Sequence, residues 1–343
     1  MSTAHPTPDL FFDTMQAYQR TAALRAAIDL SLFTAIGDGA STVPAIAVAC
    51  QASERGTRIL CDYLTIVGFL TKTCPEPGRG TGDAYQLTPA TAFFLTRKSS
   101  AYLGGTMEFM NTADVVRHFD DLAGTIRRGS IPKSDSTVSD ENPVWETFAR
   151  AMMPMMKPPA QAIAEILGVA DAGPIRVLDI AAGHGIFGIV IAQRNAQAAI
   201  VASDWAGVLK VATENAAKMG VGARHTVLAG DAFTADWGTG FDLALMTNFL
   251  HHFDIPTCTT LLKKVAAALK PGGRVAVLEF VPNDDRITPP GPAMFAMQML
   301  GGTPAGDAYT LKELTAMLKD AGFGTVSGHP LQGPETVVVG TRT

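Results

Sequence analysis

The sequence has few cysteines and no long apolar run. Its four cysteines, Cys50, Cys61, Cys74 and Cys258, include no CxxC pair, so we expect reduced thiols and neither a disulfide framework nor a bound metal. No apolar run approaches the roughly 18 residues that a membrane-spanning helix needs. The first residues also lack the basic and apolar stretches of a signal peptide. These absences predict a soluble, cytoplasmic protein with no membrane partner.

Positive charge is also scarce. The 343 residues include 27 lysines and arginines against 32 acids, a net charge of -5, which leaves no positive field for a nucleic acid partner. The apolar fraction of 47% is that of an ordinary globular protein. Because the length exceeds that of most single domains, we expect two domains, each with its own core.

The N-terminal part of the chain has the pattern of a winged helix. Apolar residues recur at helical spacing from Leu10 to Ile36. Residues 42–49 and 53–67 predict two shorter helices, the second with Ser53 as its N-cap. Residues 68–87 then predict a strand, a tip rich in proline and glycine, and a return strand.

A winged helix often binds DNA, so a transcriptional regulator is one alternative. The candidate recognition helix carries only two cations, Arg55 and Arg58, which Glu54 and Asp62 offset. Phosphate neutralisation needs more positive charge than this. The pattern therefore favours an interaction domain, and its surplus apolar helix surface favours a homodimer.

The middle of the chain combines a polar loop with a methionine cluster. Residues 129–143 are rich in Ser, Asp and Pro and predict an exposed loop. Four methionines follow on a predicted helix that continues to Leu167: Met152, Met153, Met155 and Met156. Such a cluster suits either core packing or the adaptable wall of an apolar ligand pocket.

After Gly173 the pattern changes to alternating strands and helices. Expected strands lie at 175–181, 198–204, 225–231, 241–247 and 274–280, with helices at 187–194, 208–219 and about 258–269. This alternation predicts an α/β fold with a parallel sheet covered on both faces. Acids mark the ends of the first three strands, Asp179, Asp204 and Asp231, at the edge where such sheets bind ligands.

A glycine-rich turn follows the first of these strands. Gly183, Gly185 and Gly188 satisfy GxGxxG, with Asp204 about 20 residues beyond, which keeps an NAD-dependent oxidoreductase open. Asp179, however, would face the pyrophosphate of a dinucleotide. S-adenosylmethionine carries an ammonium and a sulfonium and no phosphate, so acids beside the turn favour it.

These segments resemble the motifs of class I methyltransferases: VLDIAAGHG, VASDW, AGDAF, FDLALMTNFLHHF and PGGRVAVLEF. The resemblance implies a Rossmann-like, seven-stranded methyltransferase sheet with S-adenosylmethionine at its edge. It implies Gly183 and Gly185 at the methionine part and Asp204 at the ribose. Trp205, Asp231, Ala232 and Phe233 would lie by the adenine, and Asn248, with Asp179, would complete the cofactor site. Ala181 and Ala182 stand where that motif commonly has glycines.

Nearly the whole chain resembles the winged-helix small-molecule O-methyltransferases of plant and bacterial secondary metabolism. The resemblance implies His251 in LHHFD as general base and Glu279 in VAVLEFVP as the acid that orients it. His252 stands where the family often has Asp, and Ala308 where plant members have a second acid. Because fewer acids are present to orient the base, methyl transfer to sulfur, nitrogen or carbon by proximity alone, without a base, is an alternative.

The same resemblance implies an acceptor pocket for a small molecule, lined by Asn111, Phe148, Met152, His252, Met299 and Thr303. The alternative for the apolar members is core packing. The segment 282–292, rich in proline, is a candidate lid over this pocket.

We therefore expect an N-terminal, mostly helical winged-helix dimerisation domain over 1–100. A helical linker over 101–165 would contribute to the pocket, and a Rossmann-like catalytic domain would follow over 166–343. A fold that keeps the cofactor but catalyses a rearrangement or elimination is a further alternative.

Overall fold

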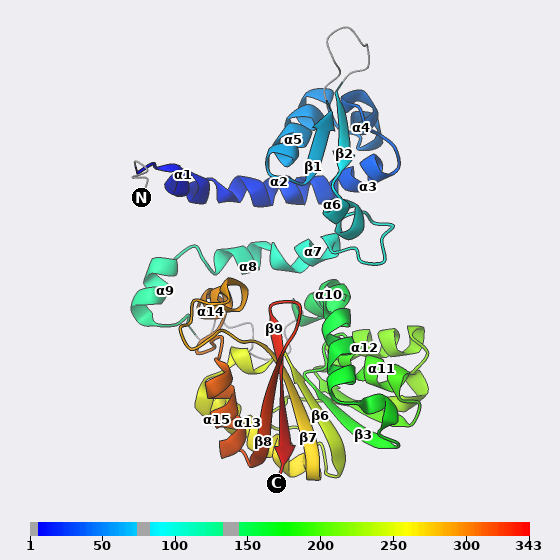
Figure 1. Cartoon of the computed structure of the whole chain (residues 1–343), viewed down its shortest axis with the longest axis vertical. Coiled ribbons are helices and arrows are strands. Elements are labelled where there is room, and N and C mark those ends of the chain that lie inside the picture. Colours follow the sequence, from blue (N-terminus) through cyan, green and yellow to red (C-terminus); the bar gives the residue numbers. More distant parts are fainter. Residues whose placement is uncertain (1–5, 74–82, 133–143) are drawn as a thin grey trace, which may run out of the picture. The chain divides into compact units, whose positions relative to one another are not determined.

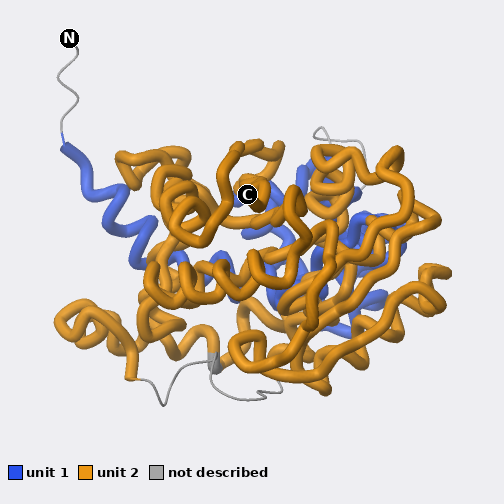
Figure 2. Tube along the Cα trace, turned by 90° about the horizontal axis from the view of Figure 1, so that it is seen from below, with its two compact units in different colours: residues 1–107 blue, residues 108–343 orange. Residues whose placement is uncertain are grey.

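The computed structural model describes residues 6–73, 83–132 and 144–343. The chain divides into two compact units, residues 1–107 and 108–343, which Figure 2 shows in different colours. Each unit has its own buried apolar core. The domain boundaries expected near residues 100 and 165 stay predictions.

The N-terminal unit consists of short helices and a hairpin. Its elements are α1 (Asp9–Met15), α2 (Ala17–Asp29), α3 (Leu32–Gly37), α4 (Val43–Ala49), α5 (Glu54–Ile66), β1 (Leu70–Thr73), β2 (Ala84–Leu87) and α6 (Pro89–Phe94). The two strands pair antiparallel, Leu70 opposite Leu87, as predicted; the predicted tip falls mostly on 74–82, outside the described residues. Ser53 caps α5 by accepting a hydrogen bond from the Gly56 amide, which confirms the predicted N-cap.

Two cations on and beside α5, Arg58 and Lys72, are paired within the unit. Arg58 and Lys72 contact the Asp62 carboxylate at 3.0 and 2.8 Å, and the Tyr85 hydroxyl donates to the same group at 2.7 Å. Lys72 also contacts the Asp83 carboxylate at 2.8 Å, so two acids offset these two cations, which supports an interaction domain over a phosphate-binding one.

The C-terminal unit begins with short helices and one long helix. These are α7 (Met107–Met110), which spans the boundary, α8 (Ala113–Arg117), α9 (Leu122–Arg128) and α10 (Val144–Ile166). The predicted methionine-bearing helix is α10. Residues 133–143 of the predicted loop lie outside the described residues.

An α/β body follows. Its strands are β3 (Ile175–Ile180), β4 (Ala198–Asp204), β5 (His225–Ala229), β6 (Phe241–Thr247), β7 (Leu269–Phe280), β8 (Phe323–Pro330) and β9 (Glu335–Arg342). Its helices are α11 (Ile186–Arg194), α12 (Ala206–Lys218), α13 (Ile255–Ala268), α14 (Pro290–Gly302) and α15 (Leu311–Asp320). Asp254 and Thr310 cap α13 and α15 by accepting backbone amide hydrogen bonds.

The seven strands form one sheet in the order β5-β4-β3-β6-β7-β9-β8. β3 to β7 run parallel, as predicted. β9 pairs antiparallel with both β7 and β8; the short connection from Pro330 to Glu335 makes β8 and β9 a hairpin. β4 and β6 flank β3 on opposite sides. The strand order runs one way from β3 to β4 and β5 and the other way from β6 to β7, so it reverses beside β3.

Helices cover both faces of this sheet, α10 to α12 on one side and α13 with α15 on the other (Figure 1). Neighbouring residues of β3 face opposite cores: Val177 packs with Ile163 and Ile189, and Leu178 with residues of α13 and α15. Burial on both faces explains the nearly continuous apolar strand sequences. It leaves the strand ends as the place for polar chemistry.

The described residues hold neither a membrane-spanning helix nor a cluster of metal ligands. No helix among them is long and apolar enough to cross a bilayer, and no three His, Cys, Asp or Glu side chains are grouped to hold a metal ion. Cys50, Cys61 and Cys258 are buried free thiols; Cys74 lies outside the described residues.

Candidate functional site

The glycine turn joins β3 to α11 at the carboxyl edge of the sheet. Gly183 and Gly185 both have positive φ, 57° and 72°, and a Cβ on Gly185 would meet Ala212 at 3.0 Å. Asp204, at the end of β4, accepts hydrogen bonds from the amides of Gly183 at 2.8 Å and Trp205 at 2.6 Å. The predicted acid and the predicted turn are therefore brought together.

Asp179 lies beneath this turn with no exposed surface. One carboxyl oxygen accepts from the Gly188 amide at 3.0 Å, and the other, Oδ1, has no hydrogen-bond partner. Burial raises the pKa of Asp179 to about 7, and the nearby Asp204 carboxylate adds to the effect. Burial also raises the pKa of Asp204. A cation or hydrogen-bond donor bound at this edge would favour the ionised form of both carboxyls and so lower their pKa.

The residues predicted at the adenine follow β5. The Asp231 carboxylate accepts from the Phe233 amide at 2.8 Å, and the Phe233 ring meets the edge of Phe253 at a centroid distance of 5.0 Å. The Ala232 carbonyl accepts from the Lys264 ammonium at 2.7 Å. This turn offers an aromatic face and polar backbone at the same edge of the sheet.

Two other predicted cofactor residues pack against α10. Trp205 joins a cluster of Ala149, Val208 and Val211. Asn248, just beyond β6, has a left-handed backbone, φ 52°, and its amide group lies 3.3 Å from the Met156 sulfur.

His251 and Glu279 are brought into contact by the ends of β6 and β7. The histidine Nδ1 lies 2.5 Å from Glu279 Oε2, and Glu279 Oε1 accepts from the amides of Phe249 at 3.1 Å and Leu250 at 2.8 Å. Both residues are buried, 5% and 2% exposed. Because one carboxylate binds both the ring and the backbone before it, the orientation of the imidazole is fixed.

A second segment, 306–309, supports the same turn. The Asp307 amide donates to the His251 carbonyl at 3.0 Å, and a Cβ on Gly306 would collide with that carbonyl at 2.1 Å. The Tyr309 hydroxyl donates to the Phe253 carbonyl. Ala308 is buried here, 1% exposed, so this segment holds the histidine by backbone contacts and not by an acid.

Aromatic rings surround the two histidines. The His251 ring lies 4.8 Å from Phe295 of α14 and 4.3 Å from His252, and Phe280 stacks on Phe295 at 4.0 Å. The His252 ring meets Trp145 at 5.5 Å. Burial and the adjacent His251 lower the pKa of His252 well below its usual value, so His252 is neutral at pH 7.

The other predicted pocket residues differ in their contacts. Phe148 meets Trp145 edge-on at 5.5 Å, and Met152 and Met299 are buried. The Thr303 hydroxyl donates to the Met299 carbonyl and accepts from the Gly306 amide, so its hydrogen bonds serve the turn that ends α14. Asn111 lies between α7 and α8.

Glu335 is a buried acid that the sequence analysis missed. It opens β9 opposite Phe280 and is 5% exposed. Burial raises the pKa of its carboxyl to about 7, and its Oε1 has no hydrogen-bond partner. The available signal was a single acid directly before the apolar run TVVVG.

The predicted lid is shorter than expected. Residues 290–292 form the first turn of α14, because proline is well suited to the first positions of a helix, so the loop ends at 289. Arg286 ties it to Asp307 at 3.2 Å and to Glu313 at 2.5 Å. The loop is thereby linked to the segment that supports His251.

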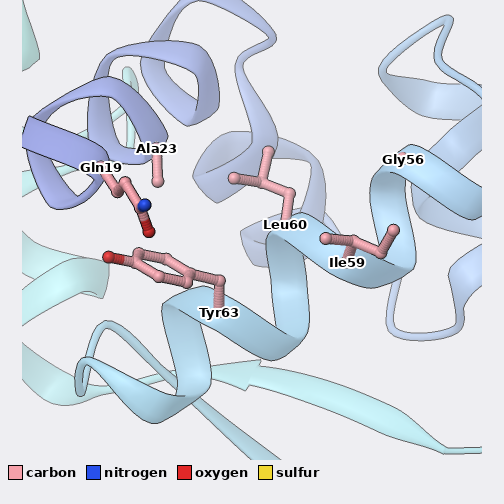
Figure 3. Close-up of a pocket in the computed structure, with 6 residues that line it drawn as sticks. All are labelled: Gln19, Ala23, Gly56, Ile59, Leu60 and Tyr63. Atoms are coloured by element: carbon pink, nitrogen blue, oxygen red, sulfur yellow. The ribbon is translucent and has the colours of Figure 1, made fainter. Parts of the chain in front are cut away.

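A shallow hollow lies between α2 and α5 of the N-terminal unit. Figure 3 shows its lining, with the Gln19 side chain directed toward the Tyr63 ring. The lining residues are Gln19, Ala23, Gly56, Ile59, Leu60 and Tyr63. The lining includes no carboxylate, histidine or thiol.

Two protein-family models match the chain. An O-methyltransferase domain matches residues 145–324, and an O-methyltransferase dimerisation domain matches residues 12–97.

Individual relatives span nearly the whole chain. A crystal structure of a Nostoc punctiforme protein assigned to the O-methyltransferases is 46% identical, covers 99% of this chain and 100% of that one, and superposes with a TM-score of 0.92. The 3-hydroxy-5-methyl-1-naphthoate 3-O-methyltransferase of Streptomyces sahachiroi is 26% identical over 93% of this chain and 90% of its own. Human N-acetylserotonin methyltransferase, solved with S-adenosylmethionine, is 20% identical with a TM-score of 0.84 over 100% and 99% of the two chains, which shows a shared fold.

The buried Asp179 predicts a pH-dependent stability. A carboxyl whose pKa rises from 3.8 to about 7 on folding costs stability as pH rises through that interval, by about 1.4 kcal/mol per pKa unit. We expect Asp179→Asn to be more stable than wild type at pH 8, with a smaller gain at pH 5, in urea unfolding of the ligand-free protein. The exposed Asp171→Asn is the control. Equal or lower stability of Asp179→Asn at pH 8 would contradict the assignment.

Proposed function

The chain belongs to the O-methyltransferase family and is an S-adenosylmethionine-dependent O-methyltransferase of small molecules; from this premise we propose that His251 is its general base. The observation that carries the proposal is the buried contact of 2.5 Å between His251 and Glu279 at the carboxyl edge of the sheet. The NAD-dependent oxidoreductase and the DNA-binding regulator are not supported, because neither accounts for both family matches.

The edge residues fit the proposed cofactor. Asp179 presents an unpartnered carboxyl oxygen beside the glycine turn, and each Asp204 oxygen retains a lone pair after its one backbone bond, which suits ribose hydroxyls. Asp231, Ala232 and Phe233 would border the adenine, with Trp205 and Asn248 completing the site. When bound, S-adenosylmethionine supplies an electrophilic methyl group on a sulfonium.

His251 would act through its second ring nitrogen. Nδ1 is held by the Glu279 carboxylate, which leaves Nε2 to accept the hydroxyl proton as the acceptor oxygen gains the methyl group. Glu279 then stabilises the imidazolium that forms. The proposed mechanism assigns no role to a metal ion.

We infer an aromatic acceptor with a hydroxyl group. Phe280 and Phe295 stack beside the His251 ring. The Trp145 ring makes edge-to-face contacts with the rings of Phe148 and His252. Offset-stacked and edge-to-face contacts with these side chains would stabilise a flat aromatic acceptor. The naphthoate and acetylserotonin named for the relatives are aromatic compounds of this kind. Met152 and Met299 would adapt the pocket to the ring system.

The base assignment predicts a large loss on substitution. His251→Ala should lower turnover on a hydroxyl acceptor about 100-fold or more, the usual contribution of a general base, in a radiolabelled methyl-transfer assay. His252→Ala is the matched control: loss of a pocket ring should raise KM, while turnover should fall little because burial keeps the pKa of this histidine too low for a general base. Unchanged turnover in His251→Ala would reject the base, and an equal loss in both variants would leave His251 without a special role.

We also propose that the N-terminal domain, residues 1–100, forms a homodimer, with 101–165 adding to the acceptor pocket and 166–343 binding the cofactor. α1 has no buried residue, and exposed apolar side chains continue into α2 and α5. These are Leu10, Phe11, Phe12, Met15, Tyr18, Ile59 and Ile66. A surface this apolar is typical of an interface.

Charges on that surface should dissociate the dimer. We expect the double variant Leu10→Asp/Tyr18→Asp to sediment as a monomer at concentrations where the wild type sediments as a dimer, because each buried carboxylate would lack a partner. Val227→Asp, which replaces an exposed apolar residue of β5, should remain dimeric. A dimeric double variant would place the interface elsewhere.

A further inference from the structure

We propose that Lys264 is a positioning residue for the adenine end of the cofactor site. Its ammonium holds the peptide that follows Ala232 and so fixes the Asp231 carboxylate, which would accept a hydrogen bond from the adenine amine. This inference rests on the proposed function, in which Asp231 borders the adenine of S-adenosylmethionine.

Lys264 lies on α13 and contacts the segment between β5 and β6 at two points. Its ammonium donates to the Ala232 carbonyl at 2.7 Å. The same ammonium lies 4.0 Å from the centroid of the Trp237 ring, within the range of a cation–π contact. One side chain therefore joins the helix to both ends of the predicted adenine turn.

The peptide that Lys264 holds also holds Asp231. Its carbonyl belongs to Ala232 and its amide to Phe233, and that amide donates to Asp231 Oδ1 at 2.8 Å. Because a peptide unit is planar and rigid, fixing its carbonyl also fixes the direction of its amide. Lys264 therefore acts on the carboxylate through a single peptide plane.

Asp231 keeps one carboxyl oxygen for a ligand. Its Oδ1 accepts from the Phe233 amide, and its Oδ2 makes no hydrogen bond to any residue that the structure describes. An ionised carboxylate can only accept hydrogen bonds, and the exocyclic amine of adenine is a donor. A fixed Asp231 would therefore favour adenine over a base with an acceptor at that position.

The Trp237 ring is anchored beside the predicted ribose acid. Its indole nitrogen donates to the Ser203 hydroxyl at 3.0 Å, and both residues are buried. Ser203 directly precedes Asp204 at the end of β4. The ring that Lys264 contacts is thus tied to the strand that carries the ribose acid, which gives the adenine turn a fixed support.

A lysine is an unfavourable choice for this place unless its charge is used. Burial lowers the pKa of Lys264, and the charges of Asp231 and Asp236 oppose that effect. An apolar side chain of similar length could pack against Trp237 without the cost of desolvating an ammonium. The bond to the Ala232 carbonyl is the contact that an apolar side chain could not make.

The deciding test is calorimetric titration of the full-length protein with two ligands, S-adenosylhomocysteine and S-inosylhomocysteine. In the second ligand a carbonyl oxygen replaces the adenine amine. We expect the wild type to prefer S-adenosylhomocysteine. Lys264→Met should bind it about 10-fold more weakly, the effect of one lost hydrogen bond to a charged group, while its affinity for S-inosylhomocysteine changes little.

Two control variants separate the donor from the loss of any lysine. Lys264→Arg retains a cationic donor that can bind a carbonyl and stack on a ring, so it should restore most of the ratio between the two affinities. Lys263→Met removes the neighbouring lysine of the same helix, which is exposed, and should leave the ratio unchanged.

A wild type that binds both ligands equally, or an unchanged ratio in Lys264→Met, would overturn the proposal. An equal loss for both ligands would also overturn it, because a lysine that only stabilises the fold would give that result. If the wild type bound neither ligand, the proposed cofactor site itself would be wrong. The two failures are therefore distinguishable, and neither measurement requires an acceptor.

Discussion

Burial of both faces of the seven-stranded sheet constrains where this protein can place charge. The central strands contribute apolar side chains to a core on each side, and an unpaired ion in either core would be costly. The carboxyl edge is where backbone amides of turns and helix starts can stabilise anions. Asp179, Asp204, Glu279 and Glu335 all lie there, on four different strands.

These acids differ in how many of their carboxyl oxygens have a hydrogen-bond partner, and the difference suggests their roles. Glu279 has backbone donors for one oxygen and the His251 ring for the other, so both of its carboxyl oxygens have hydrogen-bond partners. Asp179 and Glu335 each retain an unpartnered buried oxygen, and burial raises the pKa of both. An unpartnered buried oxygen at this edge is available to a cation or hydrogen-bond donor of a bound ligand.

The sequence was sufficient for the parts of the site that are local in the chain. The turn from Gly183 to Gly188 and the acids at the ends of β3 and β4 follow from strand periodicity and glycine spacing. Glu279 and His251 could be paired only through the family resemblance. Glu335 could not be found, because its place at this edge depends on an antiparallel strand inserted between β7 and β8. Trp205 and Thr303 have contacts, with α10 and the end of α14, that sequence spacing could not indicate.

The measurement that tests the account most directly is calorimetric titration of the protein with S-adenosylmethionine, S-adenosylhomocysteine and NAD, repeated on Asp204→Ala. The account predicts micromolar binding of the first two ligands, loss of that binding in the variant, and no binding of NAD. Binding of NAD alone, or full retention of S-adenosylhomocysteine affinity in Asp204→Ala, would contradict the assignment of the carboxyl edge as the cofactor site.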